Sequence, residues 1–110
     1  MSDEPTPAAA PSFLSADGMK PHLNDRFRLR GALEGEDLDL DLVAVETVDL
    51  PSPRPDGPPF TLLFRGPMGA AIEQQIYTLE HATLGAFDLF LVCVGPDPDD
   101  GQMRYEAIFA

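Results

Sequence analysis

The segment Arg26–Leu42, which reads RFRLRGALEGEDLDLDL, decides the fold. In its first part arginines alternate with apolar residues, and in its last part aspartates alternate with leucines. Such strict alternation is typical of strands that turn one face to a core and the other to solvent. The segment therefore predicts two half-buried strands.

The residues between these two runs predict the turn that joins them. Leu33-Glu34-Gly35-Glu36 suits a two-residue hairpin loop centred on Glu34-Gly35. A register that pairs Leu33 with Glu36 makes one face apolar and the other a ladder of opposite charges. A slip of one residue would set leucine against arginine and lose both faces. The predicted pairs are Leu29–Leu40, Phe27–Leu42, Arg30–Asp39 and Arg28–Asp41.

The rest of the chain predicts four more strands. The second strand of the first hairpin continues through Val43, Val45 and Val48. Its apolar alternation changes phase near Leu42-Val43, which predicts a β-bulge. The further strands are expected at 60–65, 76–81, 86–94 and 103–109, and the second and third of these form a hairpin. Short connections and no long helix indicate an all-β fold, a six-stranded antiparallel meander forming a small barrel or sandwich.

The strand at 86–94 is apolar on both of its faces. Phe87, Leu89, Leu91 and Cys93 alternate with Phe90, Val92 and Val94. A strand of this kind is expected to be central and covered on both sides.

The ends of the domain are defined by composition. Residues 1–12, with Pro5, Pro7 and Pro11, read as a disordered tail, and residues 13–110 as a single β domain. Ser15 can cap a short N-terminal helix that runs to about His22. The proline-dense stretch 50–59 is expected to be a surface loop, because prolines remove the backbone donors that a central strand needs.

Charge and composition exclude several function classes. A net charge of −12 is unfavourable for binding nucleic acid or an anionic membrane, so the expected partner is another protein. Cys93 is the only cysteine, which excludes a disulfide scaffold. The first residues resemble no signal peptide, and a cytoplasmic location is the default expectation.

No catalytic residue, metal ligand set or cofactor motif is predicted. His22 and His81 have no second histidine or cysteine at zinc-site spacing, so structural or surface roles are expected for both. Cys93 lies between valines and is expected to be a buried, inert thiol. The run Asp97, Asp99, Asp100 lacks the distal glutamate of a calcium loop and is expected to be a solvated turn.

Several segments together resemble a known family. They are Phe60-Thr61-Leu62-Leu63-Phe64-Arg65-Gly66-Pro67, Tyr77-Thr78-Leu79-Glu80-His81, Leu89-Phe90-Leu91-Val92, Val94-Gly95-Pro96-Asp97 and Tyr105-Glu106-Ala107-Ile108-Phe109. From about Phe27 to the C-terminus the chain is similar to a bacterial family of small domains of unknown function, often neighbours of proteins like phage tail collar or fibre proteins. The resemblance implies an accessory or assembly role and brings no catalytic residues.

Two hypotheses remain open. The first, which is favoured, is a binding or assembly module rather than an enzyme, acting through a strand edge or a loop face. The second is a small enzyme or small-ligand-binding barrel with a site inside the curled sheet. Its first polar residues to inspect are His81, Arg65 and Tyr77.

Overall fold

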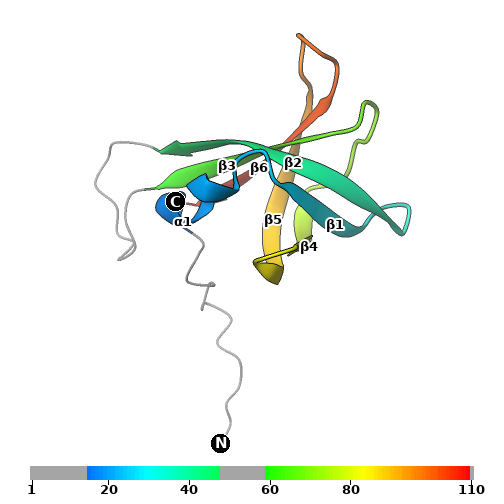
Figure 1. The fold of residues 1–110 in the computed structure, drawn as a ribbon. Coiled ribbons are helices and arrows are strands. Elements are labelled where there is room, and N and C mark those ends of the chain that lie inside the picture. Colours follow the sequence, from blue (N-terminus) through cyan, green and yellow to red (C-terminus); the bar gives the residue numbers. More distant parts are fainter. Residues whose placement is uncertain (1–14, 48–58, 110) are drawn as a thin grey trace, which may run out of the picture.

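The computed structural model describes residues 15–47 and 59–109, and these form one closed barrel (Figure 1). Neighbouring strands pair in the order β1-β2-β3-β6-β5-β4, all antiparallel. The predicted all-β fold is confirmed. Of the two architectures that the prediction left open, a barrel and a sandwich, the structure is a barrel. The strands are β1 (Arg26–Leu33), β2 (Glu36–Thr47), β3 (Phe60–Gly66), β4 (Gln75–His81), β5 (Gly85–Pro96) and β6 (Met103–Phe109).

A short helical segment precedes the barrel. Ser15 caps α1 (Ala16–Met19), since its hydroxyl accepts a hydrogen bond from the Gly18 amide at 3.0 Å. A single 3-10 turn, η1 (Lys20–His22), follows at once. The predicted cap and helix are confirmed, whereas the proposed tail and almost all of the proline-dense loop lie outside the described residues.

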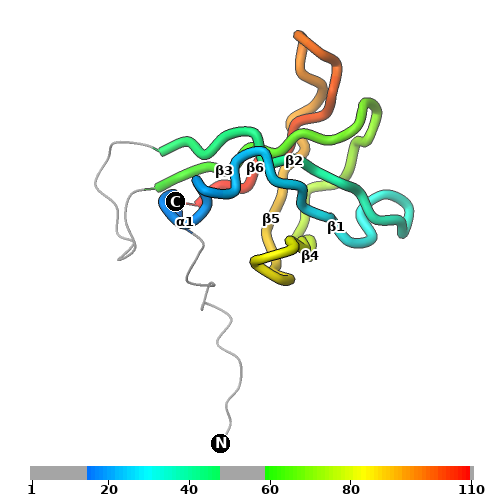
Figure 2. Tube along the Cα trace, in the orientation of Figure 1, coloured from blue at the N-terminus to red at the C-terminus, as the bar shows by residue number. Residues whose placement is uncertain are grey.

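Apolar side chains fill the inside of the barrel. Each strand turns alternate residues inward, as the alternation predicted, and the trace in Figure 2 wraps round this core. The largest fully buried side chains are Tyr105, Phe27, Phe60, Phe64, Met19, Leu29, Leu40, Leu42, Leu62, Leu79 and Leu91. Among the described residues, these side chains occupy the inside of the curled sheet.

The β1–β2 hairpin has the predicted turn but a different register. Leu33 pairs with Glu36, and Glu34 and Gly35 both have positive φ, as the predicted loop requires. The register then shifts between Leu29 and Leu33, where Gly31 has a φ of 61°. The predicted pairs beyond the turn are therefore wrong by two residues: the observed ones include Leu29–Leu38, Phe27–Leu40, Arg28–Asp39 and Arg26–Asp41.

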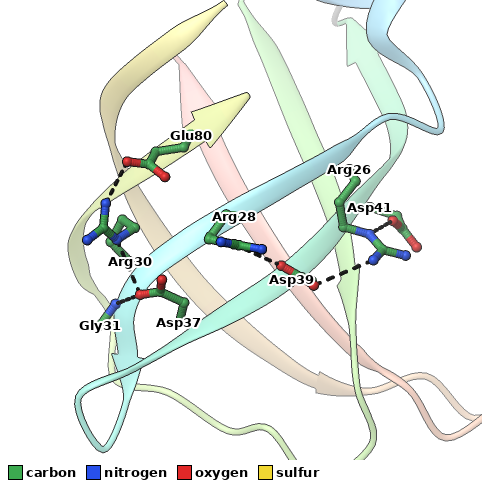
Figure 3. A network of polar contacts seen from close by, with 8 residues as sticks. All are labelled: Arg26, Arg28, Arg30, Gly31, Asp37, Asp39, Asp41 and Glu80. Carbon is green, nitrogen blue, oxygen red and sulfur yellow. Dashed lines mark hydrogen bonds and ion pairs between the residues drawn. The ribbon is translucent and has the colours of Figure 1, made fainter. Parts of the chain in front are cut away.

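A shift of two residues keeps every side chain on its predicted face, and the ladder of charges survives with new partners (Figure 3). The predicted Arg30–Asp39 and Arg28–Asp41 pairs are replaced by Arg30–Asp37 at 3.3 Å, Arg28–Asp39 at 3.4 Å and Arg26–Asp41 at 2.9 Å. The Gly31 amide, freed by the bulge, donates to the Asp37 carboxylate at 2.9 Å. That hydrogen bond, followed by the Arg30 charge, lowers the pKa of Asp37 below its ordinary value.

The predicted bulge in β2 is confirmed, since the β2–β3 register shifts between Leu42 and Ala44.

The expectation that β5 is covered on both sides is wrong. Its inward residues Phe87, Leu89 and Leu91 are buried, but Phe90 is 52% exposed and Val94 is 55% exposed. The outer wall of a closed barrel faces solvent unless another element covers it.

The barrel closes at a short seam between β1 and β4. Only two residue pairs join these strands, Arg28–Glu80 and Leu29–Leu79. Arg30 strengthens the closure through an ion pair with Glu80 at 2.6 Å. A fully open sheet edge, expected as one possible binding surface, is therefore not present.

We predict that Gly66→Ala destabilises the barrel by about 1–3 kcal/mol through overpacking. A Cβ at Gly66 would lie 2.7 Å from Cε2 of Tyr105 and 2.9 Å from Cδ2 of Leu40, both in the core. Urea unfolding of the two proteins measures the difference. Equal midpoints and slopes would contradict the close packing of Tyr105 against the β3 backbone.

Candidate functional site

Three polar side chains that are far apart in the sequence meet at one end of the barrel. His22 ends η1, Asp25 immediately precedes β1, and His81 ends β4. One carboxylate oxygen of Asp25 lies 3.0 Å from Nδ1 of His22 and 2.8 Å from Nε2 of His81. The rings of the two histidines meet edge to face, with centroids 4.8 Å apart.

The hydrogen bonds of His81 determine where its proton lies. The backbone amides of Thr83 and Leu84 both donate to its Nδ1, at 3.0 and 3.1 Å. Nδ1 therefore carries no proton, and Nε2 donates its proton to Asp25. The hydrogen bond from His81, and then that from His22, lowers the pKa of Asp25 below its ordinary value of 3.8.

The same geometry does not suit a metal ion, although the three ligand atoms lie within 4.8 Å of one another. A metal bound at Nε2 of His81 would displace its proton, and the ring would then need a proton on Nδ1. Metal-bound histidines usually donate from that second nitrogen to an acceptor. In His81 the second nitrogen faces two amide donors instead.

The cluster holds the N-terminal segment onto the barrel. Next to it, the Asn24 amide donates to the Leu42 carbonyl at 2.6 Å and the Leu42 amide donates to the Asp25 carbonyl at 3.1 Å. Met19, one helical turn earlier, is fully buried in the barrel core. These contacts agree with the structural roles expected for both histidines.

The polar residues that the sequence offered for an internal site do not come together. Tyr77 is buried, its hydroxyl donates to the Glu73 carbonyl at 2.6 Å, and burial raises its pKa. Arg65 points outward to Asp41 at 3.4 Å. His81 borders a separate open hollow of about 500 Å³ on the barrel wall, whose charged lining is Arg26, Arg28, Asp39 and Glu80.

The charges around this hollow are already engaged in ion pairs. Arg28 and Asp39 lie 3.4 Å apart, and Glu80 binds Arg30. Both ring nitrogens of His81 are engaged as well. The hollow therefore offers a ligand few unpaired polar groups.

Two further predictions concern the thiol of Cys93 and the acidic turn at 97–101. Cys93 is half-buried rather than fully buried, so the expectation of a buried thiol is only partly met. In the 97–101 turn, Asp97 and Asp100 accept hydrogen bonds from backbone amides and pair with Arg104 at 3.1 and 3.3 Å. The turn thus uses these carboxylates for its own stability.

The outer wall of β4 and β5 carries a different surface feature, an exposed apolar strip. Ile76 on β4 lies opposite Phe90 on β5, and these side chains are 66% and 52% exposed. Val92 and Val94 continue the strip along β5, the first half-buried and the second 55% exposed. We call Ile76, Phe90, Val92 and Val94 the apolar strip.

Comparison with known proteins places the chain in a family. A model of a domain of unknown function, DUF6916, matches residues 14–109. The chain belongs to the DUF6916 family. No curated protein matches it, and no solved structure does. In this DUF6916 domain no helix among the described residues is long and apolar enough to cross a membrane.

Sequence reasoning treated His22 and His81 separately and missed their meeting at Asp25. The spacing of His22 and Asp25 was visible, because they are three residues apart. His81 is 56 residues from Asp25, and only closure of the barrel brings them together. The exposure of the apolar strip was missed because a strand with apolar residues on both faces usually has both faces covered, whereas Phe90 and Val94 on β5 are exposed.

We predict that His81→Ala lowers the free energy of unfolding by about 2 kcal/mol. The variant loses a side chain that is 5% exposed, its contact with Phe27 and the donor to Asp25. Thr83→Ala is the matched control, because it changes an exposed side chain and keeps the amide that binds Nδ1. Equal stability of both variants in urea would show that the cluster does not hold the N-terminal segment.

Proposed function

We propose that this DUF6916 domain is a protein-binding module, not an enzyme, and that its partner docks on the apolar strip. The observation that carries the proposal is the pair Ile76 and Phe90, two large apolar side chains side by side and more than half exposed. Exposed apolar side chains that adjoin one another are typical of protein interaction sites. Aromatic anchors such as Phe90 are enriched in such interfaces.

The charges beside the strip indicate the chemistry of the partner. Asp88 precedes Phe90 by two residues on the same face, and Glu106 pairs with Val92 across β5 and β6. The described lysine and arginine side chains all pair with other carboxylates, so no described cation compensates Asp88 or Glu106. A partner with apolar residues bordered by lysine or arginine would be complementary.

A second copy of the chain fits this surface poorly. Two copies meeting through the strip would bring Asp88 and Glu106 of each near the like charges of the other, and each chain has a net charge of −12. The resemblance to a family found beside phage tail collar or fibre proteins suggests the setting: we propose an accessory role in assembling structures of that type.

A small-ligand site is the second candidate, because a hollow of about 500 Å³ adjoins His81. We rank it lower, since the ion pairs around the hollow and both nitrogens of His81 are already engaged. Covering the apolar strip with a partner, in contrast, would remove exposed apolar surface from water and so stabilise the complex. Burial of an exposed apolar side chain stabilises a complex by about 25 cal/mol per Å².

We predict that Phe90→Ser reduces capture of the native partner at least about tenfold, the loss expected on truncating an aromatic anchor. Tagged full-length chains are expressed in the native host, and the proteins recovered with each are quantified. Met68→Ser is the matched control, because Met68 is 69% exposed but lies on the loop between β3 and β4. Both substitutions are on the surface and should change stability by less than about 0.5 kcal/mol.

A protein recovered with the wild type and with Met68→Ser, but lost with Phe90→Ser, is the expected result. Recovery of the same proteins in the same amounts with all three chains would contradict docking on the strip.

A further inference from the structure

The seam that closes the barrel leaves part of β4 without a second neighbour. Gln75, Ile76, Tyr77 and Thr78 each pair with a residue of β5. On the other side, β4 pairs with β1 only at Leu79 and Glu80. Among the described strands, nothing pairs with the segment 75–78 on its β1 side.

The cause of this gap lies in β1. After Arg30 the strand enters the bulge at Gly31, whose amide is taken by the Asp37 carboxylate at 2.9 Å. A bulge bends its strand and increases the local twist. The β1–β2 hairpin accordingly carries its tip away from β4, as Figure 1 shows. Arg30 still reaches back across the gap to Glu80.

The free edge and the apolar strip are continuous, because Ile76 belongs to both. A strand added along 75–78 would lie next to Ile76 and extend the row Ile76–Phe90 by one more side chain. Strand addition to an exposed edge combines backbone hydrogen bonds with contacts from alternate side chains. The edge therefore offers a binding mode for the partner that the strip recognises.

We propose that the partner contributes an extended segment that adds to β4 along Gln75–Thr78, with apolar residues on one face and lysine or arginine nearby. This inference rests on the proposed function and specifies its binding mode. The basic residues would face Asp88, whose carboxylate accepts a hydrogen bond from Thr78 at 2.7 Å, next to the free edge. The backbone of β4 supplies the hydrogen bonds that the strip alone lacks.

The free protein provides the first test, by amide hydrogen exchange of the full-length chain followed by NMR. In an antiparallel strand successive amides point to opposite neighbours. Two alternate amides of 75–78 should therefore exchange slowly because they bond to β5, and the other two should exchange fast. Slow exchange of all four would show that the edge is covered and would overturn the inference.

The second test adds a capped peptide of sequence Lys-Val-Thr-Val-Thr-Val-Lys as a probe. At about ten times its Kd, the peptide should slow exchange of the two fast amides about tenfold. The control is the same peptide with every valine and threonine N-methylated, which keeps the charge and the side chains but removes the amides that a strand ladder needs on either edge. Protection by the first peptide and none by the second is the expected result.

Equal protection by both peptides, or protection by neither, would overturn strand addition. These outcomes are separable from the fate of the proposed function. If Phe90→Ser loses the native partner while neither peptide protects the β4 edge, docking on the strip stands and only the strand-addition mode is rejected. In the Phe90→Ser chain the first peptide should still protect the two amides, because their backbone edge is unchanged.

Discussion

The barrel closes through two residue pairs between β1 and β4, and the rest of the structure depends on that closure. It turns one face of every strand inward, so that the aromatic and leucine side chains fill a single core. It also brings the end of β4 beside the residues before β1, where His81 meets Asp25. Because the same closure is short, the first half of β4 pairs with only one of the described strands, β5.

The sequence predicted which side chains face the core better than it predicted which residues pair across the strands. Which residues of the first hairpin face the core was predictable, because the side-chain period of two survives any shift by an even number of residues. Which residues of the two strands pair was not predictable, because the pattern of arginine, aspartate and leucine repeats every two residues. Gly31 determined the difference: with a positive φ it introduces the bulge that moves Arg28 from Asp41 to Asp39.

The site was less predictable than the fold. The meeting of His22 and His81 depends on barrel closure, which no local pattern reports. The apolar strip was present in the sequence as the outward residues of β5, but burial on one face or two depends on whether another layer exists. No helix or sheet among the described residues lies over Phe90, so the residue that looked like core is exposed.

The binding proposal also depends on how the barrel closes. A closed barrel removes most strand edges, which limits uncontrolled pairing between chains. Among the described strands the segment 75–78 of β4 still pairs on one side only, next to an apolar row and beside a carboxylate that no described cation compensates. The net charge of −12 on the whole chain disfavours pairing between copies and is complementary to the basic partner that we propose.

The most direct test of the short seam is a set of nuclear Overhauser contacts between the backbone α- and amide protons of β1 and those of β4 in the free protein. The account predicts cross-strand contacts for the pairs at Arg28–Glu80 and Leu29–Leu79, and none between Ala32 and Ile76. Contacts that continue to Ala32 and Ile76 would show a fully closed seam with no free edge. Absence of contacts at Leu29 and Leu79 would show an open sheet, and either result would contradict the account.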